Sequence, residues 1–387
     1  MSSGRAPAGR TAAVDGLRAL AALSVLGYHA WLYTRERVDA GLRDSPADYL
    51  AHELRLGLVL FFVLSGFQLY APWVRAALGD GPEPRVGAFL LRRAGRIVPA
   101  YWVAVAGSVA LVWGLDGTPG VRLPPAQDLW LFAVFGQNFT TPTLLRLNAP
   151  LWTLAVEASF YVVLPAVGWL ALRMRGAGRE AQALVPTGLL LAGVTWNWAI
   201  AGQDVPLTLT KVLPAMVPYF AVGMLAALLA HRRELGVRAA RGLLAAGVGL
   251  VLLDAGWAAV AAHDGSRDLT LHVLRDLVAA CGFGAVLVAV TCAPAPRLLR
   301  ARPLTLVGLW SYGVYLWHVP LLLWLRGHGL LPADAWAALA VVTPPTLLVA
   351  AASWRLLERP AQEWARRASA RRPRSAGGRP AQAAAGR

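Results

Sequence analysis

An arginine and a histidine share one face of an apolar segment near the start of the chain. In DGLRALAALSVLGYHA, Arg18 and His29 are eleven positions apart. Eleven steps of about 100° return to within about 20° of the starting direction, so both side chains lie on one helix face, roughly 16 Å apart. Imidazole is the side chain best suited to general-base chemistry near neutral pH. A histidine satisfied by core packing is the alternative that remains open for His29.

A single carboxylate lies within the apolar run APLWTLAVEASFYVVLP. If this run enters the membrane from outside, Glu157 lies about 10 Å below the outer boundary, close to the depth expected for His29. The two side chains could therefore meet, and Glu157 would then fix the tautomer of His29 or stabilise its imidazolium form. An unpartnered carboxylate in hydrocarbon is very costly, so a structural pair with an arginine such as Arg275 is the alternative.

Two arginines, Arg93 and Arg96, are three positions apart in LLRRAGRIVPAYW, at the start of a predicted helix. Residues at this spacing project to one side of a helix. The planar guanidinium group binds phosphate oxygens bidentately, so the pair is suited to a phosphorylated ligand. A topology anchor at the membrane surface is the other interpretation. The same run contains Tyr101.

A third polar cluster lies in SYGVYLWHVPLL, where Ser311, Tyr315 and His318 enter one apolar segment. Pro320 lacks an N–H group and so frees a backbone carbonyl, which His318 or Ser311 could satisfy. Structural capping and chemistry therefore both remain open for this cluster.

Other residues of the apolar runs have structural interpretations. Ser65 and Gly66 in FFVLSGFQLY would let helices approach closely. Asp254, Arg275 and Asp276 are expected to form an ion-pair set inside the bundle. No GxSxG, HExxH, P-loop or CxxC pattern occurs, so the sequence indicates neither a metal site nor a nucleoside triphosphate site.

The composition defines the elements that must position these side chains. Of 387 residues, 57% are hydrophobic and only 15% are charged, whereas soluble domains have about 25% charged residues. This excludes a soluble globule and predicts an all-α polytopic membrane protein with the lipid bilayer as its partner. Ten apolar windows are long enough to span: 17–34, 55–75, 97–115, 150–172, 184–201, 211–230, 242–262, 270–292, 304–325 and 335–356.

Arginine predicts the orientation of these ten transmembrane helices. The net charge of +16 is carried by arginines in the N-terminal segment and in alternate gaps between the spans, which the positive-inside rule places in the cytoplasm. The pattern is consistent only if the short stretch 127–137 is a re-entrant or interfacial segment, and it then places both termini inside. Nucleic-acid binding is disfavoured because no stacking aromatics accompany a basic groove.

Three regions follow from this pattern. Residues 1–13 are expected to be a cytoplasmic N-terminal segment, and no small-residue cleavage pattern follows them. Residues 14–360 form the transmembrane domain. Residues 361–387, rich in Arg, Ala, Gly, Pro and Ser, are expected to be a disordered basic cytoplasmic tail.

Taken in order, the six motifs DGLRALAALSVLGYHA, FFVLSGFQLY, RRAGRIVPAYW, LWTLAVEASFY, SYGVYLWHVPL and SWRLLERP resemble the membrane-bound acyltransferase 3 family. The resemblance covers about residues 14 to 360. It implies a multi-pass protein of the cytoplasmic membrane that moves an acyl group from cytoplasmic acyl-CoA to a hydroxyl of a sugar, cell-envelope glycan or glycosylated metabolite. Acetyl-CoA is the expected donor. The family's motif positions fall on Arg18, His29, Arg93, Arg96, Glu157, Ser311, Tyr312, Tyr315, His318, Glu358 and Pro360.

The resemblance also assigns roles to residues. His29 and Glu157 are the expected catalytic residues, and Arg18, Arg93 and Arg96 the expected acyl-CoA ligands. Substrate-binding or structural roles are expected for Ser65, Tyr101, Trp152, Ser311, Tyr315 and His318. The chain departs from the family pattern at Gln68, where an aliphatic residue is commoner.

Two questions stay open at this level. Direct transfer to the acceptor is the simpler mechanism, while a covalent relay through a histidine or through Ser65 or Ser311 is the alternative. A multispan transporter or flippase is the rival class, because many spans and intramembrane charge suit it equally.

Overall fold

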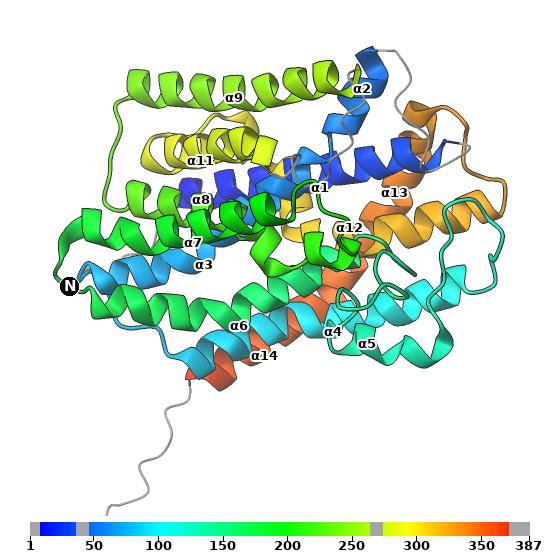
Figure 1. Ribbon diagram of the computed structural model, residues 1–387, viewed down its shortest axis with the longest axis horizontal. Helices are drawn as coiled ribbons and strands as arrows, with labels where there is room; N and C mark the ends of the chain where they lie inside the picture. The colour runs from blue at the N-terminus through cyan, green and yellow to red at the C-terminus, as the bar shows by residue number, and fades with distance from the viewer. Residues whose placement is uncertain (1–7, 36–45, 264–273, 371–387) are drawn as a thin grey trace, which may run out of the picture.

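The computed structural model describes residues 8–35, 46–263 and 274–370, and every regular element in these ranges is helical (Figure 1). The long helices lie roughly side by side. The elements are α1 (Ala8–Tyr33), α2 (Pro46–Glu53), α3 (Leu56–Ala77), α4 (Val86–Val112), η1 (Ala126–Asp128), α5 (Trp130–Ala133), α6 (Leu151–Arg173), α7 (Gly178–Ile200), η2 (Leu207–Thr210), α8 (Leu213–Ala230), α9 (Val237–His263), α11 (Leu277–Cys292), η3 (Leu298–Arg300), α12 (Arg302–Gly327), α13 (Ala335–Ser353), η4 (Trp354–Glu358) and α14 (Arg359–Ala370).

The all-helical, multi-pass character predicted from composition is confirmed. Eight segments of the described chain, containing α3, α4, α6, α7, α8, α9, α12 and α13, are long and apolar enough to cross a membrane. Each of the ten predicted windows overlaps a helix, but residues 270–273 of the window 270–292 lie outside the described ranges, and α11 within that window has 16 residues. Helix α1 is more polar than the eight because it contains Asp15, Arg18 and His29. The number of ten spans therefore stays a prediction.

Helix α8 lies at the centre of the bundle, and α7 and α9 lie at its edge. In the apolar window of the segment that contains α8, 72% of the residues are buried. In the corresponding windows of α7 and α9, only 17% of the residues are buried. Because lipid covers a helix face without any specific partner, a peripheral helix can leave apolar side chains exposed. The chemistry-bearing helices α1, α3, α4, α6 and α12 pack against one another or against this centre.

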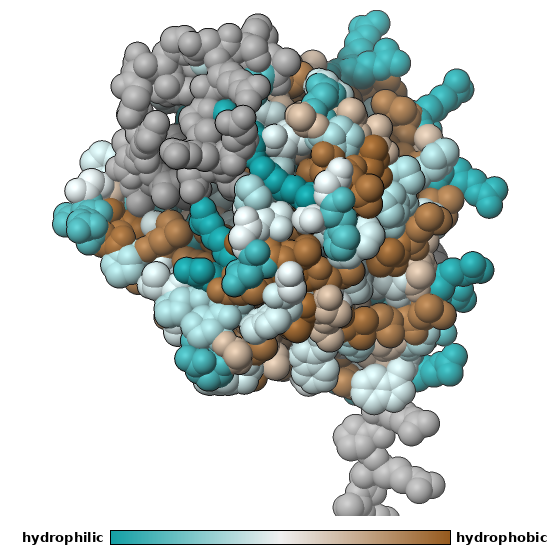
Figure 2. Space-filling model, turned by 90° about the vertical axis from the view of Figure 1, so that its right-hand side faces the viewer, coloured by the Kyte–Doolittle hydropathy of each residue, from teal (hydrophilic) through white to brown (hydrophobic). Residues whose placement is uncertain are grey.

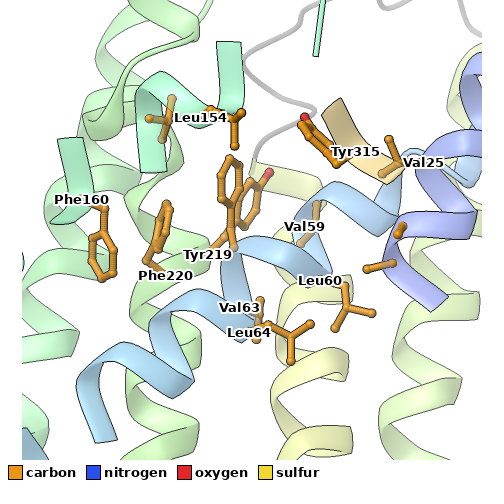
Figure 3. Close-up of a cluster of buried hydrophobic side chains, with 14 of the residues drawn as sticks. Val25, Val59, Leu60, Val63, Leu64, Leu154, Phe160, Tyr219, Phe220 and Tyr315 are labelled. Carbon is orange, nitrogen blue, oxygen red and sulfur yellow. The ribbon is translucent and has the colours of Figure 1, made fainter. Parts of the chain in front are cut away.

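Helices α3 and α8 approach so closely that only glycine fits at two positions of their contact. A Cβ atom added to Gly66 would lie 2.0 Å from the Phe220 carbonyl oxygen, and one added to Gly223 would lie 2.0 Å from that of Val63. This confirms the close approach predicted from Ser65 and Gly66 in FFVLSGFQLY. Aromatic rings fill the space beside it, with the Phe160 and Phe220 ring centroids 4.1 Å apart (Figure 3).

The segment 127–137 does not cross the bundle. Its only α-helix, α5, has four residues, and the segment folds back along α4. Trp102 Nε1 donates to the Ala133 carbonyl at 2.9 Å, and the rings of Tyr101 and Phe135 stack at 4.2 Å. Because Trp102 lies about 15 Å from the C-terminal end of α4, this segment reaches well along the helix and then returns.

The predicted disorder from residue 361 is wrong for residues 361–370, which belong to α14. This helix packs along α4 (Figure 1), where Ala365 faces Gly95 and Arg85 donates to the Ser369 carbonyl at 2.6 Å. Ala365 and Ser369 are one turn apart and buried, so the small residues of an arginine-rich segment form a packing stripe. Residues 371–387, like residues 1–7, lie outside the described part of the chain.

Helix α1 also begins earlier than predicted, at Ala8 instead of near residue 14. Apolar patterning does not detect this first turn, because it contains Arg10.

We predict that Gly66→Ala destabilises the protein, because the new Cβ would meet the backbone of α8. The expected cost is about 1–3 kcal/mol, measured as a lower midpoint of thermal unfolding in detergent. Gly188→Ala on α7 is the matched control, because nothing lies within 4 Å of its added Cβ. Equal unfolding midpoints for the two variants would contradict this packing.

Candidate active site

Two cavities lie inside the bundle, and α1 contributes to both. The first, called here the arginine cavity, has a volume of about 70 Å³. Its chemistry-bearing lining residues are Arg18, Ser65, Gln68, Arg93, Arg96, Glu157, Tyr161, Ser311, Tyr312 and Tyr315. The second, called the histidine cavity, has a volume of about 530 Å³. It is lined by His29, His52, Arg55, Arg122, Trp152, Lys211, Tyr219, Asp276, Tyr315 and further apolar and aromatic residues.

The two cavities share the side chains of Leu58 and Tyr315. Tyr315 is fixed in place, because its hydroxyl donates to the Pro150 carbonyl at 2.9 Å and lies 2.6 Å from Thr153 Oγ1. Arg18 and His29, eleven residues apart on α1, therefore face different cavities on the two sides of this boundary. The eleven-residue spacing of Arg18 and His29 therefore places one of these side chains in each of the two adjoining cavities.

His29 is hydrogen-bonded to a second histidine. Its Nδ1 lies 2.9 Å from the Val25 carbonyl oxygen and 3.1 Å from His318 Nε2. The Nδ1 of His318 lies 3.0 Å from the Val314 carbonyl oxygen. Since a carbonyl can only accept, both rings carry a proton on Nδ1, and His318 Nε2 accepts from His29. The Nε2 lone pair of His29 remains for a ligand in the histidine cavity.

The backbone carbonyl freed by Pro320 is satisfied by neither His318 nor Ser311. Proline has no N–H to give to the carbonyl of Leu316, four residues earlier. Asn148 Nδ2 donates to that oxygen at 3.0 Å, and Asn148 is itself almost fully buried. The capping interpretation of the cluster is therefore wrong for this carbonyl, because the loop before α6 supplies the donor and leaves His318 to contact His29.

Glu157 does not contact His29 in this structure. Its Oε1 accepts hydrogen bonds from Ser65 at 3.0 Å and Tyr161 at 2.6 Å, and it lines the arginine cavity. The expected pairing is wrong because helix α6 directs Glu157 toward α3, whereas α12 places His318 beside α1. Tyr161, one turn after Glu157, is a site residue that the sequence analysis missed.

The alternative partner of Glu157, Arg275, is engaged elsewhere. It forms ion pairs with Asp254 at 4.0 Å and Asp276 at 3.4 Å, as expected for a structural set. Arg55 extends the set, because its guanidinium group binds Asp276 at 2.5 and 2.9 Å.

The arginine cavity brings together the three arginines singled out in the sequence. Arg18 donates to Gln68 and lies 3.5 Å from Asp15, so the unusual Gln68 orients this guanidinium group. In the described part of the chain, the buried Nε of Arg93 has no hydrogen-bond partner. Arg96 lines the same cavity. Three guanidinium groups and the carboxylate of Glu157 thus line this cavity, and guanidinium groups are suited to binding anions.

The remaining predicted residues are distributed unevenly. Ser65 and Ser311 line the arginine cavity and Trp152 lines the histidine cavity. Tyr101 lines neither of these two, because its fully buried ring stacks on Phe135. Its role here is packing of the folded-back segment 127–137 against α4.

Comparison with known sequences decides the family. The acyltransferase 3 family, described as an acyltransferase domain, matches residues 11–355. The chain belongs to this family. The matched residues include the residues given above for the lining of the two cavities, and both His29 and His318. The resemblance inferred from the six motifs is thereby confirmed.

Several curated proteins are similar to the chain over most of its length. Nodulation protein 10 of Rhizobium leguminosarum bv. viciae is 28% identical over 90% of this chain and 92% of that protein. Exopolysaccharide production protein ExoZ of Rhizobium meliloti is 29% identical over 79% of this chain and 88% of its own. Peptidoglycan O-acetyltransferase OatA of Listeria monocytogenes is 24% identical over 90% of this chain but only 55% of that longer protein. No solved structure matches the chain.

We predict that His29 and His318 both carry their proton on Nδ1. NMR of ¹⁵N-histidine-labelled protein in nanodiscs would distinguish the two ring nitrogens of each residue, with His29→Asn and His318→Asn used to assign the signals. A proton on Nε2 of neutral His29 would contradict the hydrogen-bond network.

Proposed function

We propose that this family member is an O-acyltransferase of the cytoplasmic membrane that transfers an acetyl group from cytoplasmic acetyl-CoA to a glycan hydroxyl. The observation that carries the proposal is the meeting of two cavities at Tyr315, one lined by three arginines and the other by an available histidine nitrogen. The names of the relatives, which include peptidoglycan O-acetyltransferases and an exopolysaccharide production protein, support a glycan acceptor.

Arg18, Arg93 and Arg96 would bind the phosphates of the donor. The arginine cavity, at about 70 Å³, is narrow, so the nucleotide would lie at its mouth and the slender pantetheine arm would extend inward. The arm is about half a bilayer long and would bring the thioester past Tyr315 to His29. We place this mouth, the N-terminus and α14 on the cytoplasmic side, following the positive-inside rule.

His29 Nε2 would remove the proton from the acceptor hydroxyl as its oxygen attacks the thioester carbonyl carbon. The new C–O ester bond forms, the C–S bond breaks, and the proton passes from His29 to the departing CoA sulfur. His318 would act as a positioning residue, because its Nε2 accepts from Nδ1 of His29 and stabilises the imidazolium form. Glu157 would balance part of the arginine charge. Because Ser65 donates its hydroxyl proton to Glu157, we assign Ser65 a structural role and take the transfer to the acceptor as direct.

His29→Ala is expected to reduce acetyl transfer by about 10²–10⁴-fold, because general-base catalysis supplies an effect of that size. CoA release from acetyl-CoA by purified protein in nanodiscs, with mass spectrometry of peptidoglycan and exopolysaccharide fragments, measures it. The thermal unfolding midpoint of the variant serves as the folding control. Transfer at the wild-type rate would remove His29 from the mechanism, and a protein that moves glycans without acetylating them would favour a transporter.

Arg93→Gln is expected to raise the KM for acetyl-CoA about tenfold while changing kcat little, because a charged hydrogen bond to phosphate is lost. Arg92→Gln is the matched control. Arg92 does not line the arginine cavity and instead lies 3.4 Å from Ser369 of α14. An equal rise in KM for both variants would show a nonspecific effect of basic charge.

A further inference from the structure

The only lysine of the chain, Lys211, lines the histidine cavity together with His29. It follows η2 and precedes α8, and no motif in the sequence singles it out. Its Nζ lies 4.6 Å from the ring centroid of Trp152, which lines the same cavity. Lys211 is half-buried, and an ammonium group withdrawn from bulk water is costly unless an anion or another polar partner compensates it.

A buried amide fixes the backbone of both residues. Asn138 Nδ2 donates to the Lys211 carbonyl at 2.6 Å and to the Trp152 carbonyl at 2.7 Å, and Asn138 is 1% exposed. Asn138, in the connection between α4 and α6, therefore holds the backbones of Lys211 and Trp152 at a fixed distance from each other.

The other charges of this cavity do not neutralise Lys211. Asp276 is its only lining carboxylate among the described residues, and both oxygens of Asp276 are bound by Arg55. Glu53 also pairs with Arg55, at 3.0 Å. Within the described ranges, no carboxylate lies at ion-pair distance from Lys211.

We propose that the histidine cavity binds an acceptor sugar unit that carries a negative charge, a carboxylate or a phosphate, with Lys211 as its counter-ion. This rests on the proposed function, because the cavity is taken as the acceptor site. The anion contacts Lys211, the sugar ring packs on Trp152, and a hydroxyl of the same unit reaches His29 Nε2. The part of the face seen in Figure 2 that is not grey mixes hydrophilic and hydrophobic side chains.

The sole lysine gives a direct test in the wild-type protein. With ¹⁵N-lysine labelling in nanodiscs, the Nζ signal of Lys211 is followed by NMR during titration with three probes and without acetyl-CoA. Methyl β-glucuronide carries a carboxylate, glucose 1-phosphate a phosphate, and methyl β-glucoside no charge. At least one anionic probe should shift the signal saturably, at concentrations at least about tenfold below those of the neutral glucoside. Which anion binds more tightly distinguishes the two sources of charge.

Variants separate Lys211 from the other cations. Lys211→Gln should bind the preferred anionic probe about tenfold more weakly in saturation-transfer NMR, while Lys211→Arg should stay within about threefold of wild type. Arg175→Gln is the charge-matched control, because Arg175 forms an exposed ion pair with Glu83.

Equal binding of charged and neutral probes to the wild type would overturn the inference, as would an unchanged anion preference in folded Lys211→Gln. If that variant fails to fold, the wild-type titration still decides. These titrations contain no acetyl-CoA, so they test anion binding alone. Anion binding at Lys211 together with no acetyl transfer in the separate acetyl-CoA assay would contradict the proposed function while leaving the anion site at Lys211 in place.

Discussion

Polar side chains inside a bundle that spans hydrocarbon must find partners within the protein, and this constraint organises the whole site. His29 is held by His318, Glu157 by Ser65 and Tyr161, and Arg55 by Asp276. Among the described residues, the polar groups that form no hydrogen bond or ion pair are then informative. His29, through its Nε2, and Lys211, through its ammonium group, belong to the lining of one cavity, and Arg93, whose buried Nε has no hydrogen-bond partner there, lines the other.

The division into two cavities follows from helix packing. Close contacts through glycine bring α3 against α8, and α1 lies along α12. The polar residues of α1, α3, α4, α6 and α12 thereby converge on the two cavities that meet at Tyr315. A donor and an acceptor that enter separate compartments can meet at one boundary without either crossing the membrane. In the proposed reaction, the same separation would limit the access of water to the thioester and so favour transfer over hydrolysis.

Much of this architecture was predictable from the sequence, because helix periodicity and hydropathy are local properties. The shared face of Arg18 and His29 and the pairing of Arg93 with Arg96 required only helix geometry. The Glu157–His29 contact was wrongly predicted because depth in the membrane does not specify which helices are neighbours. For the same reason His318 was assigned two open roles, and Lys211 was missed because its importance comes from Asn138 and Trp152, which lie far from it in the sequence.

In the proposed reaction, the donor occupies the arginine cavity and reaches His29 past Tyr315. Cryo-electron microscopy of the protein with a non-transferable thioether analogue of acetyl-CoA would show the donor's position. We expect the phosphates at Arg93 and Arg96, the pantetheine arm beside Tyr315 and the acyl end next to His29 Nε2. Phosphates bound in the histidine cavity, beside Lys211 and Arg55, would contradict this placement of the donor.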